Sequence, residues 1–253
     1  MIELNAEKIR DFRGCRYLYK AKHIEKIPQK HSVSERDMLP AQLEDAVKKT
    51  IKSFYFEVMN DAVPSYKEVQ KKFEKLWLKE KTVKDIIRDE NTPQKNVHHF
   101  TTEGLKIITQ FYKMNYRKPG KVIFLSEDYC IPFTENVVIS GTIDLAIEKD
   151  GKIHLPIYTT KGKSYFSEGN EGYYKAMLDT IATNNKAGNK SPFVKIMYFK
   201  GGTIREETIV IDKLKVRQLK EVAEEINECK RFLPNHDYYW CKNCSMNKYC
   251  STW

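Results

Sequence analysis

Apolar residues in the first half of the chain recur at helical spacing. Residues 4–23 place Ile9, Phe12 and Tyr19 near one face, and Asn5 stands at the N-cap position. Three further segments repeat apolar residues every three to four positions: 41–60, 65–80 and 101–118. This pattern predicts a layer of amphipathic helices whose apolar stripes pack against another part of the protein.

After Pro119 and Gly120 the pattern becomes that of β-strands. Three consecutive segments are rich in β-branched and aromatic residues and are separated by Asn, Asp and Gly: 121–133, 136–151 and 152–160. A helix, two strands and a long helix follow: 170–185, 193–201, 203–212 and 212–233. This order predicts an α/β fold with a central mixed sheet flanked by helices.

Composition agrees with a folded protein of one elaborated domain, or a domain with a helical insertion. The chain has 253 residues, of which 41% are hydrophobic and 12% aromatic. The first residues contain no apolar run with a cleavage site, and no stretch is long and apolar enough for a membrane span. We therefore expect an intracellular protein, cytoplasmic or nuclear according to its host, with no membrane partner.

The charge balance favours an anionic partner. There are 44 Lys and Arg residues against 34 Asp and Glu residues, which gives a formal charge of +10 at pH 7. Such an excess suits the neutralisation of nucleic-acid phosphates. Lys-rich surfaces also occur on proteins without such a partner, so the charge alone does not decide the function.

Three cysteines lie close together in the last part of the sequence, as Cys241-x2-Cys244-x5-Cys250. In a reducing compartment such a group is expected to hold a metal and not to form disulfides. Four thiolates suit tetrahedral zinc or an iron–sulfur cluster, and Cys15 is the candidate for the fourth. A site that joins Cys15 to the other three would close a very long loop, which removes on the order of 5 kcal/mol of denatured-chain freedom in the entropic model.

The two remaining cysteines have simpler interpretations. Cys229 falls on the apolar face of the predicted helix 212–233, and Cys130 lies within a predicted strand. Both are expected to be small buried hydrophobic residues.

The combined pattern resembles a known family. A first cysteine in the segment LNAEKIRDFRGCRYLYK, the terminal Cys-x2-Cys-x5-Cys and the strand motif Gly141-x-x-Asp144 resemble the iron–sulfur branch of the RecB-like PD-(D/E)XK nucleases. That branch includes the CRISPR adaptation nuclease, the AddB subunit of bacterial recombination nucleases and the replication helicase-nucleases of eukaryotes. The resemblance spans nearly the whole chain.

The resemblance implies four parts and a cofactor. The parts are an N-terminal helix with the first cysteine, a helical insertion, a PD-(D/E)XK nuclease-like α/β core and a C-terminal cysteine motif: 1–22, 23–117, 118–233 and 234–253. The cofactor is a [4Fe-4S] cluster that clasps the chain, with zinc as the alternative. Its ligands would be Cys15, Cys241, Cys244 and Cys250.

The catalytic motif of this family is incomplete here. Its members cut phosphodiesters with divalent cations held by an aspartate and a second carboxylate, and a lysine follows two residues after that carboxylate. Asp144 matches the aspartate, but the next strand ends IYTTKGK where active relatives have a sequence such as IDYKTGK. One alignment places Tyr158 and Thr160 at the carboxylate and lysine positions, and the other places Ile157 and Thr159 there.

Other parts of the family pattern also differ. Asp45 and Lys49 stand where relatives have Gly-x3-His, and Lys175 and Asp179 stand where they have a glutamine and a tyrosine. Asp144 and Lys161 remain as catalytic candidates. Lysines and tyrosines around the former site form a candidate nucleic-acid-binding surface: Lys161, Lys163, Lys175, Tyr158 and Tyr165.

Two functions follow as expectations. In the first, the protein is a catalytically degenerate member that binds nucleic acid, with DNA favoured, or acts as a scaffold with protein partners in a DNA-processing or viral assembly. In the second, it is an enzyme, a DNA nuclease dependent on Mg2+ or Mn2+, whose missing ligands come from other positions. Glu127, Asp128 and Glu148 are examples of such positions.

Overall fold

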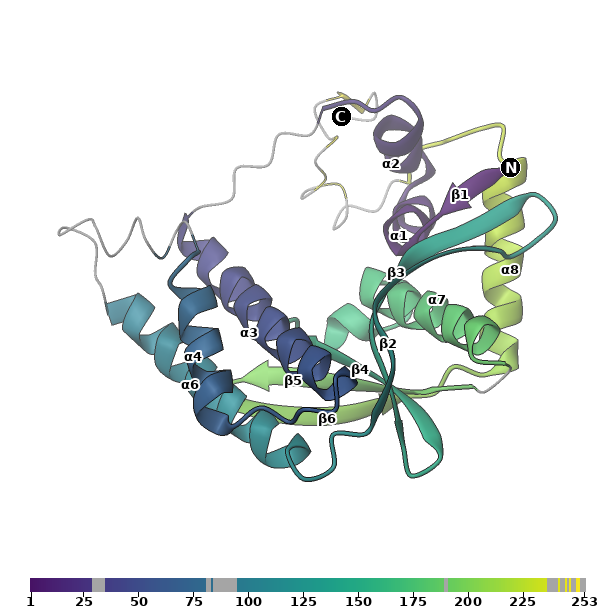
Figure 1. Cartoon of the computed structure of the whole chain (residues 1–253). Helices are drawn as coiled ribbons and strands as arrows, with labels where there is room; N and C mark the ends of the chain where they lie inside the picture. The colour runs from purple at the N-terminus through teal and green to yellow at the C-terminus, as the bar shows by residue number, and fades with distance from the viewer. Residues whose placement is uncertain are drawn as a thin grey trace.

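The computed structural model describes most of the chain (Figure 1). The described residues are 1–28, 35–80, 83, 95–188, 191–235, 241, 244, 246, 249 and 250. Within them a six-stranded mixed sheet is flanked by seven α-helices. The expectation of an α/β fold with a central mixed sheet is thus confirmed.

The sheet runs in the order β1-β3-β4-β5-β6, and β2 pairs with β3 outside this path. Neighbouring strands are parallel at β1–β3 and at β4–β5, and antiparallel elsewhere. The strands are β1 (Ile2–Leu4), β2 (Lys121–Pro132), β3 (Val137–Lys149), β4 (Lys152–Thr159), β5 (Phe193–Lys200) and β6 (Thr203–Ile209). Five of the six agree with the segments expected from sequence, and the short β1 was not anticipated.

Strand β3 has an edge that is only partly paired. Strand β2 runs along one of its edges, while the other edge pairs with β1 at residues 137–139 and with β4 at residues 147–149. Between these pairings, residues 140–146 have no ladder partner on that edge among the described strands. Strands β3 and β4 therefore diverge from their shared hairpin, which turns through Asp150 and Gly151, both at positive φ. The unpaired stretch contains Asp144.

Each face of the sheet carries its own set of helices (Figure 1). On one face pack α1 (Ala6–Gly14), α7 (Glu171–Lys186) and α8 (Lys213–Glu228). On the other pack α3 (Glu35–Met59), α4 (Tyr66–Trp77) and α6 (Lys95–Asn115), whose buried residues form a second core with side chains of β3, β4 and β5. This helical layer was expected from the 3-to-4 spacing of apolar residues. None of the helices in the described part of the chain is both long and apolar enough to cross a membrane.

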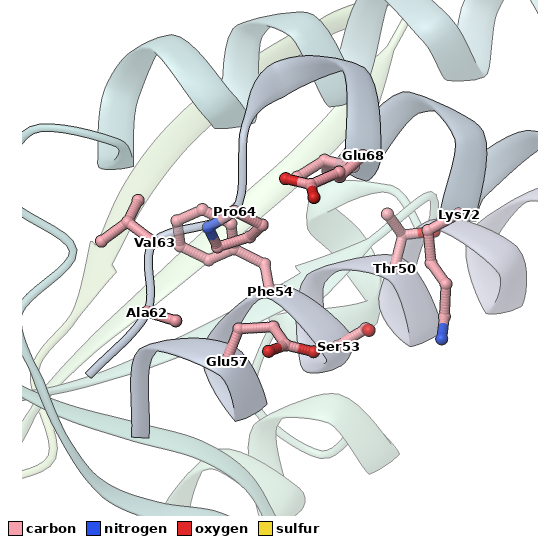
Figure 2. Close-up of a pocket in the computed structure, with 10 residues that line it drawn as sticks. Thr50, Ser53, Phe54, Glu57, Ala62, Val63, Pro64, Glu68 and Lys72 are labelled. Atoms are coloured by element: carbon pink, nitrogen blue, oxygen red, sulfur yellow. The ribbon is translucent and has the colours of Figure 1, made fainter. Parts of the chain in front are cut away.

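A groove of about 340 Å³ lies between α3 and α4. Figure 2 shows side chains of α3, of α4 and of the connecting loop facing one another across it: Thr50, Ser53, Phe54, Glu57, Ala62, Val63, Pro64, Glu68 and Lys72. One of its carboxylates, Glu68, is already used in a capping box with Ser65, which begins α4. The groove belongs to the packing of this helix pair and not to the unpaired edge of β3.

The N-terminal region is not one continuous helix. Asn5 does cap α1, since its Oδ1 accepts a hydrogen bond of 2.9 Å from the Lys8 N–H. The helix stops at Cys15, which is extended, and α2 (Arg16–Tyr19) and a π-helical turn η1 (Lys20–Ile24) follow. Cys15 therefore lies between α1 and α2, outside the helical conformation of both.

The two cysteines expected in the core differ from each other. Cys130 is exposed, so the expectation of a buried residue was wrong. The reason is the alternation of side chains along β2, in which Tyr129 and Ile131 take the buried positions on either side of it. Cys229 is half-buried against the core, but it follows the end of α8 and does not lie within the helix.

Candidate functional site

Asp144 lies in the unpaired stretch of β3, between lysines from both helical layers. Its Oδ1 is 3.1 Å from Nζ of Lys52 on α3, and its Oδ2 is 3.6 Å from Nζ of Lys175 on α7. Burial acts to raise the pKa of Asp144, but the positive charges of Lys175, Lys52 and Lys48 outweigh it and hold the pKa below its ordinary value. Asp144 is therefore a carboxylate with both oxygens in ion pairs.

Lys175 interacts with three oxygens at once. Its Nζ donates to Oδ2 of Asp179 at 2.7 Å and to the carbonyl oxygen of Thr142 at 3.0 Å, and it faces Asp144. The carbonyl of Thr142 belongs to the unpaired edge of β3, so the lysine satisfies a backbone acceptor that lacks a strand partner. Tyr129 of β2 donates its hydroxyl to Oδ1 of Asp179 at 3.0 Å. The network joins β2, β3 and α7.

Gly141 makes room for this network. A Cβ atom at this position would lie 2.5 Å from the hydroxyl oxygen of Tyr129. Since Tyr129 holds Asp179, the glycine of the Gly-x-x-Asp motif has a local packing reason in this chain. Beside Asp144 a cavity of about 340 Å³ is lined by residues of β3, α7 and the start of α1.

The end of β4 carries no carboxylate. Tyr158 is buried, 7% exposed, and its ring packs against Phe111 and Phe199 of the second core. Thr160 follows the strand, and both its N–H and its hydroxyl donate to Oε2 of Glu44 at 2.6 Å. In one alignment the positions that the motif assigns to a carboxylate and a lysine are thus occupied by a core aromatic residue and a threonine. In the other they are occupied by Ile157, which packs against the first core, and by Thr159, which is buried.

Glu44 reaches the end of β4 from α3. The hydroxyl of Thr159 donates to its Oε2 at 3.3 Å, and Lys48 forms an ion pair with its other oxygen. Burial acts to raise the pKa of Glu44, but Lys48 and the donors of Thr160 lower it below its ordinary value. Sequence reasoning missed Glu44, Lys48 and Lys52. Their spacing of four residues, which puts all three on one face of α3, was the available signal.

The cysteines are brought together across the length of the chain. The backbone N–H of Asn235 donates to Sγ of Cys15 at 3.3 Å, and the thiol of Cys241 donates to the Asn235 carbonyl at 3.3 Å. Burial raises the pKa of the Cys244 thiol, and the charges of Cys15, Cys241 and Cys250 raise it further. The other three thiols are therefore close enough to Cys244 to affect its charge.

The surroundings of the thiols suit thiolate ligands. N–H groups point at two of the sulfurs, from Asn235 to Cys15 and from Met246 to Cys244 at 3.4 Å. Such N–H groups stabilise negative sulfur in thiolate-bound metal centres. In the part of the chain that the structure describes, no three His, Cys, Asp or Glu side chains meet closely enough, as they stand, to hold a metal ion. The four described thiols therefore lie near one another without forming a closed ligand group.

Comparison with known proteins identifies the fold. Residues 3–251 match the sequence model of the PD-(D/E)XK nuclease superfamily. The chain belongs to the PD-(D/E)XK nuclease superfamily. No curated protein matches the chain significantly. A crystal structure titled that of SSO0001 aligns over 97% of this chain and 95% of that chain, at 12% identity and a TM-score of 0.37, a likeness too distant to support an argument.

Lys161 and Lys163, which were expected at the PD-(D/E)XK cleft, contact residues other than Asp144. Lys161 places its Nζ over the ring of Tyr165 at 5.2 Å, and Lys163 forms an ion pair of 2.7 Å with Glu207. Tyr165 packs against α7, where Gly172 leaves room for its ring. Both lysines are exposed, and the contacts place them on the rim of the molecule beyond the end of β4.

Tyr158 cannot act as a base-stacking residue in this PD-(D/E)XK protein, because its ring is buried. Asp45 and Lys49, at the positions of the family's Gly-x3-His, pair with each other near the surface, each about half exposed. Asp144, Lys175 and Asp179, by contrast, form one cluster at the unpaired edge of β3.

The three alternative carboxylates have other neighbours. Glu127 forms an ion pair with Lys186, and Asp128 accepts a hydrogen bond of 2.7 Å from the hydroxyl of Thr142. Glu148 lies opposite Ile153 of β4, near the β3–β4 turn. The carboxylate next to Asp144 in this network is Asp179, with Lys175 between the two. Burial raises the pKa of Asp179 above its ordinary value, and the charge of Asp144 acts in the same direction.

Proposed function

We propose that this protein is a catalytically degenerate PD-(D/E)XK nuclease-fold protein that binds nucleic acid, DNA in the first place, as a subunit of a DNA-processing or virus-encoded assembly. The observation that carries the proposal is the state of Asp144, whose two oxygens face the ammonium groups of Lys52 and Lys175. A divalent cation at that carboxylate would meet two positive charges at contact distance.

The missing ligands support the same conclusion. Mg2+ needs several oxygen ligands at close to octahedral geometry and gives up its water reluctantly. The strand position of the second carboxylate holds Tyr158 or Ile157, according to the alignment, and neither is acidic. The nearby Glu44 is already engaged by two threonines and Lys48. The described residues therefore offer no free pair of carboxylates around Asp144 for phosphodiester hydrolysis.

A binding role has support from the charge of the chain and from lysines near Asp144. Lys48, Lys52 and Lys175 are each about one third exposed, and they pair with Glu44, Asp144 and Asp179. The whole chain carries a formal charge of +10. Phosphate groups of a nucleic-acid backbone are the anions that such an excess of positive charge suits.

The test combines a cleavage assay with a binding assay. Wild type and Asp144→Ala are incubated with single-stranded and duplex DNA in Mg2+ and in Mn2+. We expect no cleavage by either protein, and binding whose affinity falls steeply with salt. Cleavage by wild type that Asp144→Ala abolishes would overturn the proposal and identify a working nuclease, with Glu44 as the next carboxylate to test.

Matched charge variants locate the binding surface. Lys48→Gln with Lys52→Gln removes two charges from the cleft, and Lys67→Gln with Lys71→Gln removes two exposed charges from α4. We expect the first pair to weaken DNA binding and to reduce the slope of log K against log salt by about one to two units. An equal effect of the two pairs would place the binding surface elsewhere.

We also propose that Cys15, Cys241, Cys244 and Cys250 hold a [4Fe-4S] cluster that acts as a structural clasp. The support is the convergence of the four thiols and the N–H groups directed at two of them. Protein purified without oxygen should be brown and contain iron and sulfide. Cys15→Ser should lose both and unfold more easily, while Cys130→Ser, which changes an exposed cysteine outside the group, should keep them. A colourless protein with stoichiometric zinc would refute the cluster.

A further inference from the structure

The ammonium group of Lys175 lies among oxygens of the kind that a divalent cation binds. It is 2.7 Å from a carboxylate oxygen of Asp179, 3.0 Å from the carbonyl oxygen of Thr142 and 3.6 Å from a carboxylate oxygen of Asp144. Two carboxylates and a backbone carbonyl are typical hard ligands for Mg2+, Mn2+ or Ca2+. We call this group of three oxygens the Lys175 cage.

The cage is held in place by the fold. The Asp179 side chain is 6% exposed and is fixed by the hydroxyl of Tyr129, for which Gly141 leaves space. The carbonyl of Thr142 is available because its edge of β3 has no strand partner there. Lys175 thus fills a preformed position made by three elements, unlike a mobile ion pair on the surface.

The charges also balance without a metal ion. Asp144 and Asp179 together carry two negative charges when ionised, and Lys175 and Lys52 supply two positive charges in contact with them. A divalent cation in the place of Lys175 would leave one positive charge in excess, because Lys52 stays in contact with Asp144. With Lys175 in place, the residues do not fit a divalent cation at Asp144, because the ion and the ammonium would compete for the same oxygens.

We propose that Lys175 is a built-in replacement for the divalent cation of this fold, so that the cleft binds phosphodiesters without metal, and that removing its side chain uncovers a cation site. The statement about phosphodiesters deepens the proposed function and rests on it. The statement about cations concerns Asp144, Asp179 and the Thr142 carbonyl alone. The two are tested separately.

The cation test uses Mn2+ and no nucleic acid. Free Mn2+ is followed by electron paramagnetic resonance during titration of wild type, Lys175→Ala and Lys186→Ala. The last variant removes another ion-paired lysine from the same helix and is the charge-matched control. We expect Lys175→Ala to bind one Mn2+ at least about tenfold more tightly than the other two, since a positive charge at contact distance is removed. Adding Asp144→Asn to Lys175→Ala should abolish the gain.

Two results would overturn the proposal. One is tight stoichiometric Mn2+ binding by wild type that Asp144→Asn removes, because the lysine would then not exclude the ion. The other is a Lys175→Ala protein with the far-UV circular dichroism of wild type that binds Mn2+ no better than Lys186→Ala.

A measurement on wild type alone covers the case in which Lys175→Ala does not fold. DNA affinity should be the same, within about twofold, in EDTA and in Mg2+, apart from the change due to ionic strength. Affinity that is lost in EDTA would refute metal-free binding. If wild type binds no DNA in either condition, the proposed function fails, while the Mn2+ titration still decides the role of Lys175.

Discussion

Glu44 is expected to be the main polar link between the helical layer and the end of β4. Its Oε2 accepts hydrogen bonds from the N–H and hydroxyl of Thr160, each 2.6 Å, and from the hydroxyl of Thr159 at 3.3 Å. Its side chain is 13% exposed and also pairs with Lys48. The substitution Glu44→Ala removes all of these contacts at once.

The expected destabilisation follows from the hydrogen-bond donors that Glu44→Ala leaves without an acceptor. The N–H of Thr160 would lose its acceptor at a half-buried site, which costs about 1–3 kcal/mol, and the loss of charge-assisted bonds from the hydroxyls adds to this. We expect a total loss of about 2–4 kcal/mol in the free energy of unfolding. For a chain of this size each kcal/mol lowers Tm by about 2–4 °C, so the decrease should be roughly 4–16 °C.

The pH dependence has a definite sign. The pKa of Glu44 in the folded protein is below its ordinary value of 4.5. The stabilisation by its charge is therefore complete above that ordinary value and is lost as the pH falls through the folded-state pKa. Glu44→Gln keeps an acceptor but no charge, so wild type should exceed it most at neutral pH, and the difference should shrink below about pH 4.5.

Thermal and urea unfolding followed by circular dichroism measure these effects. Asp45→Ala is the matched control, because Asp45 lies on the same helix in an ion pair that is about half exposed. Its effect should stay within about 0.5 kcal/mol. The reasoning is refuted if Glu44→Ala is no more destabilising than Asp45→Ala, or if the advantage of wild type over Glu44→Gln grows as the pH falls.

Two further substitutions probe the cleft and the N-terminal corner. Gly141→Ala places a Cβ atom 2.5 Å from the Tyr129 hydroxyl, so it should cost about 1–3 kcal/mol by urea unfolding. Tyr129→Phe in the same chain should recover part of the loss, and no change in stability would contradict the close contact. Asp11 is 2% exposed and pairs with Arg10, Lys22 and His23, so Asp11→Asn should cost about 3–5 kcal/mol at pH 7. Burial acts to raise the pKa of Asp11, but His23 and Arg10 hold it below its ordinary value of 3.8. The difference in stability between wild type and Asp11→Asn should therefore shrink only below that pH. A difference that stays constant down to about pH 3 would contradict this reasoning.

The order of elements was predictable because periodicity reports which face of a segment is buried. The segments 41–60, 65–80 and 101–118 became α3, α4 and α6, and the three strands after Gly120 became β2, β3 and β4. The break at Cys15 was not predictable in this way. The apolar positions on its two sides stay in helical phase, while the contact that Cys15 makes through its sulfur is with Asn235, far along the chain.

The candidate site was only partly predictable, since its contacts come from tertiary structure. Asp144 was identified by its motif, and Lys175 and Asp179 by their spacing on one helix. The role of Lys175 depends on the divergence of β3 from β4, which exposes the carbonyl of Thr142, and no local pattern reports that divergence. Glu44 approaches Thr160 across a sequence separation of 116 residues.

The loss of the catalytic strand motif and the packing of the helical layer are physically coupled. Tyr158 is in the second core between aromatic residues of α6 and β5, so a carboxylate at this position would be buried without a partner, at a cost of several kcal/mol. Thr160 supplies the donors that hold Glu44 of α3. Restoring the motif on β4 would therefore weaken the helical layer before it produced a metal site. In this chain the end of β4 serves the packing of α3 and α6 on the sheet, and the charged groups around Asp144 are Lys52, Lys175 and Asp179, which form one network of ion pairs.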